Sequence, residues 1–307
     1  MDELEQAELT IAEALREAVT RLRVAGVAEP RREAGSLLSH TTGRDSAFLI
    51  THADESLTAE QLSTFRAFVA RRVAGEPFQY IARRQEFYGL EFEVTPEVLI
   101  PRPETELLVE TALELLKGRE APLVCDVGTG SGCIVVSLLH ERADARGLAL
   151  DISAEALRIA ERNAARHGVH ERIRFLVSDC FDALRGDKHE DSGEHRNSGK
   201  HTDTRFDLIA SNPPYIAERD LAGLQREVRE HEPREALTPG GDGLSVIRRL
   251  LAEAPQFLKP GGHFLMEIGF DQHEQVAALT DARVWTLIEI YKDLQGIPRT
   301  VALRLAE

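Results

Sequence analysis

The spacing of apolar residues predicts different kinds of structure in different parts of the chain. Up to about residue 75, apolar side chains recur at the spacing of an amphipathic helix. In the first such stretch they are Leu4, Ile11, Leu15, Val19 and Leu22. Gly26 marks its expected end, a second helix should begin near Pro30, and the capping box Thr58-Ala-Glu-Gln61 predicts a third. We predict a small helical bundle over residues 1–75, with docking of a substrate as its role because it carries no chemical motif.

The pattern changes after this block. Aromatic and β-branched residues surround a glycine in Phe87–Val94, a composition typical of a β-hairpin. The two prolines of Val98–Pro103 then interrupt regular structure, and the second is suited to start a helix over residues 104–117. Residues 76–103 are therefore predicted to form a β-hairpin linker between two domains.

From residue 122 onward, short apolar runs alternate with helical patterns, as in a doubly wound α/β sheet. The runs that predict strands are residues 122–127, 147–151, 173–177, 206–211, 262–268, 284–290 and 299–305. Only Tyr291–Pro298 joins the last two, which is too short for a helical crossover, so this pair should be antiparallel. We predict an α/β domain with a seven-stranded sheet over residues 104–307.

Residues 185–205 interrupt the alternation with a stretch that contains no aliphatic, aromatic or cysteine side chain. Such a segment cannot bury enough apolar surface to offset its ordering entropy, so it predicts a mobile loop. Its evenly spaced His189, His195 and His201 suggest a metal ion, but no carboxylate or cysteine stands at metal-site spacing. A solvated loop is the preferred interpretation, and no metal site is predicted.

Composition narrows the class of function. The net charge of −15 and the pI of about 5.3 argue against non-specific binding to a nucleic-acid backbone. The three cysteines, an odd number without a C-x-x-C pair, favour buried free thiols in a reducing compartment. The chain has no signal-peptide pattern and no apolar run that approaches the roughly 20 residues of a membrane span. These features predict a cytoplasmic protein that does not enter a membrane.

A glycine-rich turn follows the first predicted strand of the sheet. Gly128, Gly130 and Gly132 let the backbone turn tightly and approach a ligand without Cβ clashes. Their G-x-G-x-G spacing, without a P-loop lysine, counts against a dinucleotide or a nucleoside triphosphate. Asp151 ends the next predicted strand, where it can accept hydrogen bonds from ribose hydroxyls, so the pair predicts an adenosine ligand without phosphates. Asp179, which ends the third strand, suits an adenine contact and a helix N-cap equally well.

A second motif ends the strand predicted at residues 206–211. Asn212-Pro213-Pro214-Tyr215 stops the sheet ladder because proline donates no backbone hydrogen bond. Asn212 is thereby left at the sheet edge where open α/β folds bind ligands. Taken alone, the tetrapeptide is equally well explained as a proline turn, and the adenosine site predicted nearby favours a functional role.

Together these motifs resemble class I methyltransferases, whose methyl donor is S-adenosylmethionine. The tetrapeptide resembles that of enzymes which methylate amino groups of nucleic-acid bases or of protein glutamine. Five further segments, over nearly the whole chain, resemble the peptide chain release factor glutamine methyltransferases. They are Phe78–Ile81, Leu99–Glu106, Glu232–Leu237, Gly240–Leu244 and Lys292–Gly296. The resemblance implies a Rossmann-like methyltransferase sheet and methylation of the Gln in the Gly-Gly-Gln motif of class I release factors.

The resemblance also assigns residues to the site. The implied cofactor-binding residues are Gly128, Thr129, Gly130, Ser131, Gly132, Asp151, Asp179, Cys180 and Asn212. The implied substrate-binding residues are Asn212, Pro213, Pro214 and Tyr215, with Asn212 and Pro213 as the catalytic pair. The family often has an aromatic residue at the position of Cys180, and Phe181 is the candidate to replace it against the adenine.

The chemistry of an amide explains why these residues suffice. An amide nitrogen is a poor nucleophile because its lone pair is delocalised, so catalysis depends on orientation. The Asn212 side-chain oxygen and the Pro213 carbonyl can accept its two N–H groups and aim the lone pair at the methyl carbon. Tyr215 can pack on the amide near the sulfonium, with plain aromatic packing as the alternative. No general base is assigned.

Two other functions remain open from the sequence. A nucleic-acid adenine methyltransferase shares the tetrapeptide, but it should carry a basic, aromatic-rich surface, and this chain is acidic. A catalytically silent scaffold would not need the intact glycine turn or Asn212. Four residues near the sheet edge are left outside the predicted site because structural roles explain them almost as well: Arg102, Thr105, Glu106 and Glu267.

Overall fold

The computed structural model describes residues 9–185 and 205–306. The chain divides into two compact units, Met1–Arg84 with Leu224–His231, and Gln85–Gly223 with Glu232–Glu307. Residues 186–204 of the predicted mobile loop lie outside the described part, so that prediction stays open. Within the described residues, no helix has both the length and the apolar character needed to cross a membrane.

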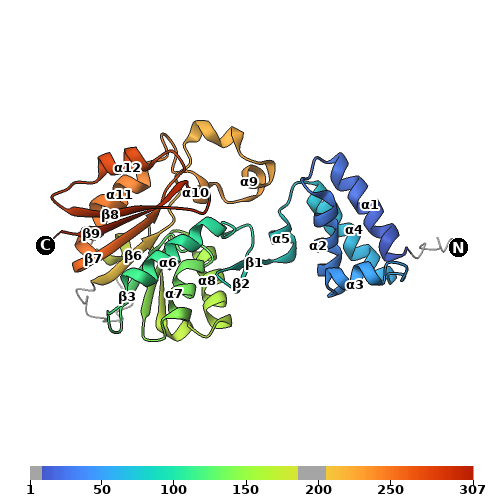
Figure 1. The fold of residues 1–307 in the computed structure, drawn as a ribbon, viewed down its shortest axis with the longest axis horizontal. Helices are drawn as coiled ribbons and strands as arrows, with labels where there is room; N and C mark the ends of the chain where they lie inside the picture. The colour runs from blue at the N-terminus through green and yellow to red at the C-terminus, as the bar shows by residue number, and fades with distance from the viewer. Residues whose placement is uncertain (1–8, 186–204, 307) are drawn as a thin grey trace, which may run out of the picture. The chain divides into compact units, whose positions relative to one another are not determined.

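The first unit is helical (Figure 1). Its helices are α1 (Ile11–Val24), α2 (Pro30–Thr42), α3 (Ser46–Thr51), α4 (Ala59–Val73), α5 (Phe78–Ala82) and α9 (Arg226–His231). The predicted helices are confirmed as α1, α2 and α4, and the Thr58 capping box starts α4. Helix α1 begins at Ile11 because Thr10 and Glu13 form a capping box of their own. Helices α3 and α5 were not predicted, since neither is long enough to show a helical period.

Helix α9 belongs to the first unit although it is far from it in sequence. The guanidinium of Arg72 in α4 pairs with Glu33 at 3.0 Å and with Glu227 at 2.5 Å. Arg226 donates to the carbonyl oxygen of Ala74 at 2.8 Å. Arg72 is buried, so its guanidinium needs hydrogen-bond partners inside the protein, and the two carboxylates supply them. No local pattern in the sequence indicates this association.

The second unit contains the predicted sheet. Its strands are β3 (Leu123–Val127), β4 (Arg146–Asp151), β5 (Ile173–Val177), β6 (Phe206–Ser211), β7 (Leu258–Glu267), β8 (Trp285–Lys292) and β9 (Pro298–Leu305). They lie in the order β5-β4-β3-β6-β7-β9-β8. All pairs are parallel except those of β9, which confirms the seven-stranded α/β fold with an antiparallel last pair. The predicted hairpin is also present, as β1 (Arg84–Phe87) and β2 (Leu90–Glu93).

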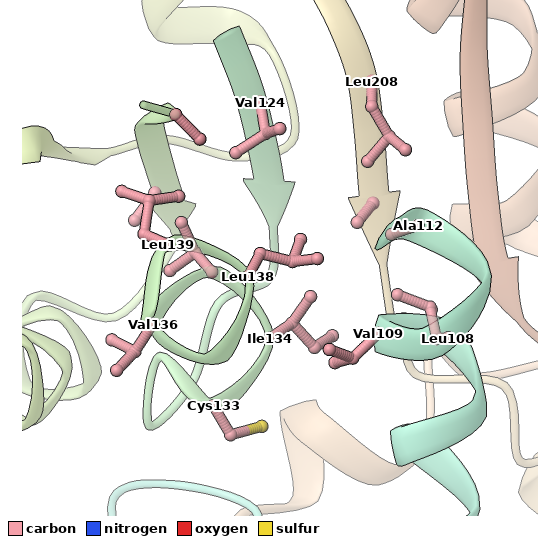
Figure 2. Close-up of a cluster of buried hydrophobic side chains, with 14 of the residues drawn as sticks. Leu108, Val109, Ala112, Val124, Cys133, Ile134, Val136, Leu138, Leu139 and Leu208 are labelled. Atoms are coloured by element: carbon pink, nitrogen blue, oxygen red, sulfur yellow. The ribbon is translucent and has the colours of Figure 1, made fainter. Parts of the chain in front are cut away.

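Helices cover both faces of the sheet because its strands are apolar on both faces. One core contains side chains from α6 (Glu106–Leu115), α7 (Cys133–Glu141) and α8 (Ala154–Arg166). Figure 2 shows its central part, where α6 and α7 direct Leu108, Ile134 and Leu138 toward strand residues Val124 and Leu208. The opposite core contains side chains from α11 (Ser245–Glu253) and α12 (His273–Leu279).

The strand register brings the sequence motifs to one edge. Val127 is paired with Leu150 and with Ser211, and Ser211 is paired with Met266. The residues that follow these positions are therefore at the same level, at the carboxyl ends of parallel strands. This edge is where ligands bind in open α/β sheets.

Candidate active site

A cavity of about 360 Å³ lies at this edge. That volume is within the range of small-molecule sites. The residues predicted for the site that line it are Gly128, Thr129, Gly130, Ser131, Asp151, Asp179, Cys180, Asn212, Pro213 and Pro214. Gly132 and Tyr215 are not among the described lining residues. Most of the residues predicted for the site thus lie on the wall of one cavity, and their roles there stay predictions.

The glycine turn exposes bare backbone to the cavity. Gly128 and Gly130 have φ values of 73° and 54°, and a Cβ atom on either would meet no described atom within 4 Å. Both positions therefore use glycine for its backbone conformation and leave room for a ligand. At Gly132, with φ 80°, a Cβ would lie 3.0 Å from the Cβ of Ala160. Gly132 thus allows close packing of α7 on α8, which is the role of the last glycine in such turns.

Buried polar groups hold the turn from beneath. The Thr129 hydroxyl donates to Asp126 at 2.7 Å, and burial raises the pKa of Asp126 to about 7. Asn163, fully buried in α8, donates to the carbonyl oxygens of Ser131 and Glu93 at 2.9 and 3.0 Å. The Thr129 hydroxyl and the Ser131 carbonyl are therefore bonded within the protein, and these bonds fix the backbone of the turn.

Asp151 is aimed at the cavity by two backbone amides. The N–H groups of Gly130 and Ser153 donate to its two oxygens at 2.8 and 2.9 Å. Burial raises the pKa of Asp151, and these donors oppose that shift. The next residue, Ile152, is 62% exposed and also lines the cavity. The Asp151 carboxylate can accept hydrogen bonds from hydroxyl groups, and it lies beside the apolar Ile152 and the open glycine backbone. This combination fits a nucleoside without phosphates.

The three residues Asp179, Cys180 and Phe181 after β5 have different surroundings. The Asp179 carboxylate pairs with Arg249 at 2.7 Å and does not cap the 3-10 helix that follows, while its predicted contact with adenine stays a prediction. Cys180 lines the cavity with φ 47°, and burial raises the pKa of its thiol to about 11. Phe181 is fully buried and stacks on Phe257 with centroids 4.9 Å apart. Of these two neighbours, only Cys180 reaches the cavity wall.

Asn212 belongs to a hydrogen-bond network of four side chains. Its Nδ2 donates to the Thr105 hydroxyl at 3.1 Å, and that hydroxyl donates to Glu267 at 2.6 Å. The Tyr215 hydroxyl donates to the other oxygen of Glu267 at 3.1 Å. Burial raises the pKa of Glu267, while the two hydroxyl donors and the charge of Arg299 oppose the rise. The tetrapeptide is thus linked through its first and last side chains to β7.

Sequence reasoning left Thr105 and Glu267 outside the site and missed Asn163. Thr105 sits in a 3-10 turn, Pro103–Thr105, that places it on the cavity wall. Asn163 carried a usable signal, because asparagine is unfavourable inside a helix unless its side chain has a task. Glu267 ends an apolar strand, which pointed to a special environment without identifying its partners.

Two further predictions concern the cysteines and the potential metal ligands. All three cysteines are free and buried, as predicted. Within residues 9–185 and 205–306, no group of three or more His, Cys, Asp or Glu side chains is arranged to hold a metal ion.

Comparison with known proteins gives a consistent result. Residues 13–82 match the family model of the PrmC N-terminal domain, and residues 120–289 match a methyltransferase domain. The release factor glutamine methyltransferase of Nitratidesulfovibrio vulgaris is 43% identical over 96% of this chain and 95% of that protein. The protein of the same name from Burkholderia pseudomallei is 45% identical over 89% and 91%. Among solved structures, the hMettl16 catalytic domain has a similar fold, with a TM-score of 0.50, 15% identity and coverage of 78% and 81%.

Proposed function

Because the chain belongs to the release factor glutamine methyltransferases, we propose that it methylates the Gln of the Gly-Gly-Gln motif in class I peptide chain release factors. The product would carry the methyl group on the side-chain amide nitrogen. The observation that carries the proposal is the 43% identity to a relative of that name over nearly the full length of both chains. The cofactor of this methyltransferase family is S-adenosylmethionine.

The residues of the cavity suit that cofactor. Asp151 would hold the ribose hydroxyls, and the open backbone of Gly128 and Gly130 would lie along the rest of the molecule. Ile152 and Cys180 offer apolar surface to the adenine. When bound, S-adenosylmethionine supplies an activated methyl group on a positively charged sulfur.

Asn212 and Pro213 would orient the substrate amide. The Asn212 side-chain oxygen and the Pro213 carbonyl accept the two N–H groups, which directs the lone pair of the nitrogen out of the amide plane. Pro213 and Pro214 fix their backbone φ angles, so these acceptors need little rearrangement when substrate arrives. The nitrogen loses one proton to water after transfer, and no side chain is assigned as a base. Tyr215 would support Asn212 through its hydrogen bond to Glu267.

A labelling experiment tests the proposed function. The purified chain is incubated with methyl-labelled S-adenosylmethionine and a class I release factor, its Gly-Gly-Gln variant with Gln replaced by Ala, or DNA. We expect label on the unmodified factor alone. Label on DNA only would support an adenine methyltransferase, label on both factors equally would place the target elsewhere, and no label would favour a silent scaffold.

Replacing Asp151 tests the cofactor site. Asp151→Asn turns one acceptor oxygen into a donor that faces a backbone N–H or a ribose hydroxyl. Hydrogen bonds to a charged group contribute about 1.5–3 kcal/mol, so the Kd for S-adenosylmethionine should rise about tenfold or more. Isothermal titration measures this directly.

Asp179→Asn is the matched comparison for that experiment. Its carboxylate also lies at the cavity wall but is paired with Arg249 and half exposed. Exposed pairs contribute about 0.2–1 kcal/mol, so Kd should change less than about fivefold. An equal or larger rise for Asp179→Asn would restore the adenine contact predicted from the sequence. An unchanged Kd for Asp151→Asn would remove Asp151 from the site.

A further inference from the structure

When Glu267 is ionised, only one assignment of donors and acceptors satisfies the hydrogen bonds around Asn212. Glu267 is 2% exposed, and its two oxygens contact the hydroxyl groups of Thr105 and Tyr215. A carboxylate only accepts hydrogen bonds, so both hydroxyls must donate to it. The Thr105 hydroxyl has one hydrogen, and it donates that hydrogen in its bond to Glu267. Toward Asn212, 3.1 Å away, Thr105 can therefore act only as an acceptor.

This direction decides which end of the Asn212 amide faces the cavity. The oxygen and nitrogen of an asparagine amide have nearly the same shape, so packing alone does not distinguish two orientations related by a flip. Because Thr105 accepts, Asn212 must present its Nδ2 to Thr105, and its Oδ1 is left for another partner. We propose that Thr105 and Glu267 are positioning residues that hold the Asn212 oxygen toward the substrate nitrogen.

The proposal rests on the proposed function, because the orientation matters only if the group to be methylated donates N–H bonds. With the amide flipped, the Asn212 NH₂ group would face the NH₂ group of the substrate. Two donors cannot bond to each other, and the near-attack orientation of the nitrogen would be lost. Thr105 and Glu267 would thus affect turnover without touching the reacting atoms.

One of the two charges near Glu267 favours its carboxylate form. Arg299 favours the ionised state, and its guanidinium is held by Asp293 at 3.2 Å. Asp293 in turn accepts hydrogen bonds from the backbone of Gln295 and Ile297. Burial and the nearby Glu104 act in the opposite direction. The Lys292–Gly296 segment, to which the sequence assigned no function, therefore contributes to the network by fixing Arg299.

Kinetics with conservative variants test the proposal. Thr105→Val keeps the side-chain shape and removes the acceptor, and we expect kcat on the release factor to fall about tenfold to 100-fold with an unchanged cofactor Kd. Thr105→Ser restores the hydroxyl and should recover most of the activity. Thr111→Val is the matched control, because Thr111 is a buried threonine in α6 and is not among the described cavity-lining residues. Unchanged kcat in Thr105→Val, or a fall explained by weaker cofactor binding, would overturn the proposal.

A second measurement tests the orientation of the Asn212 amide and does not depend on an activity assay. The chain contains three asparagines, Asn163, Asn197 and Asn212, so selective ¹⁵N labelling gives three side-chain NH₂ signal pairs. Asn212→Ala identifies the Asn212 pair, and Asn163, bonded to Ser131 and Glu93, is the internal reference. We expect hydrogen exchange at Asn212 to be slow in the wild type and in Thr105→Ser, and faster in Thr105→Val. Equal exchange in all three proteins would refute the proposed contact even if the release factor proved not to be the substrate.

Discussion

Asn212→Ala is expected to lower kcat for methylation of the release factor by about 10²- to 10³-fold, the cost of removing one fixed polar contact at a reacting centre. The alanine methyl group cannot accept an N–H bond, so the substrate amide loses the partner that orients its lone pair. The Kd for S-adenosylmethionine should stay near that of the wild type, because Asp151 and the glycine turn remain. Single-turnover labelling with saturating cofactor, together with titration of the cofactor, separates the two quantities.

Asn212→Asp is the informative companion variant. Both of its oxygens are acceptors, so the substrate contact is kept while the hydrogen bond donated to Thr105 is lost. We expect its kcat to lie between those of the wild type and Asn212→Ala. Unchanged turnover in Asn212→Ala would contradict the orienting role, and a loss of cofactor affinity alone would make Asn212 part of the cofactor site only.

The parts of the fold that were predictable are those with strong local signals. The central strands β3 and β6 are short, mostly apolar runs that are buried on both faces, and such runs need no knowledge of their neighbours to be recognised. The start of α4 was predictable because Thr58 and Gln61 satisfy the free backbone amides of the first turn by themselves. Glycines 128 and 130 were predictable for a similar reason, since their spacing reflects a backbone requirement.

The parts that could not be predicted depend on contacts between distant residues. The bond from Thr105 to Glu267 spans 162 positions and that from Arg72 to Glu227 spans 155. A threonine before a helix and a glutamate after a strand each have an ordinary local explanation. Only the three-dimensional arrangement shows that Thr105 and Glu267 share one buried network with Asn212.

The same reasoning separates shape from chemistry in the tetrapeptide. Its prolines end β6 and fix the backbone, a property of the local sequence. The direction in which Asn212 presents its oxygen is set by residues before α6 and at the end of β7. The local sequence thus places Asn212 at the sheet edge, and tertiary contacts determine whether its oxygen or its nitrogen faces the substrate.

Gly243→Ala is expected to displace the backbone of the tetrapeptide at Tyr215 and to lower both the stability and the activity of the protein. Gly243 has φ 81°, and a Cβ there would lie 2.3 Å from the carbonyl oxygen of Tyr215 and 2.9 Å from the amide nitrogen of Ala217. That carbonyl oxygen also accepts a hydrogen bond from Gln272 at 2.9 Å, so the backbone of Tyr215 cannot move without losing it. Overpacking and the unfavourable φ together should cost about 2–5 kcal/mol, with a fall in kcat of more than about 100-fold from the displaced loop. Urea denaturation and the labelling assay measure the two effects.

Gly241→Ala is the control that separates the effect of backbone strain from the effect of a steric clash by the added Cβ. Gly241 lies in the same Gly240–Leu244 segment with φ 56°, but a Cβ there would meet no described atom within 4 Å. Its substitution should therefore cost only the backbone strain, about 1–2 kcal/mol, and leave turnover near that of the wild type. If the two alanine variants were equally stable and equally active, the packing of Gly243 against Tyr215 would not be what holds the tetrapeptide in place. A selective loss in Gly243→Ala would instead explain why the segment Gly240–Leu244 accompanies Asn212-Pro-Pro-Tyr215 in this chain: its glycine permits the close backbone contact that supports the reactive loop.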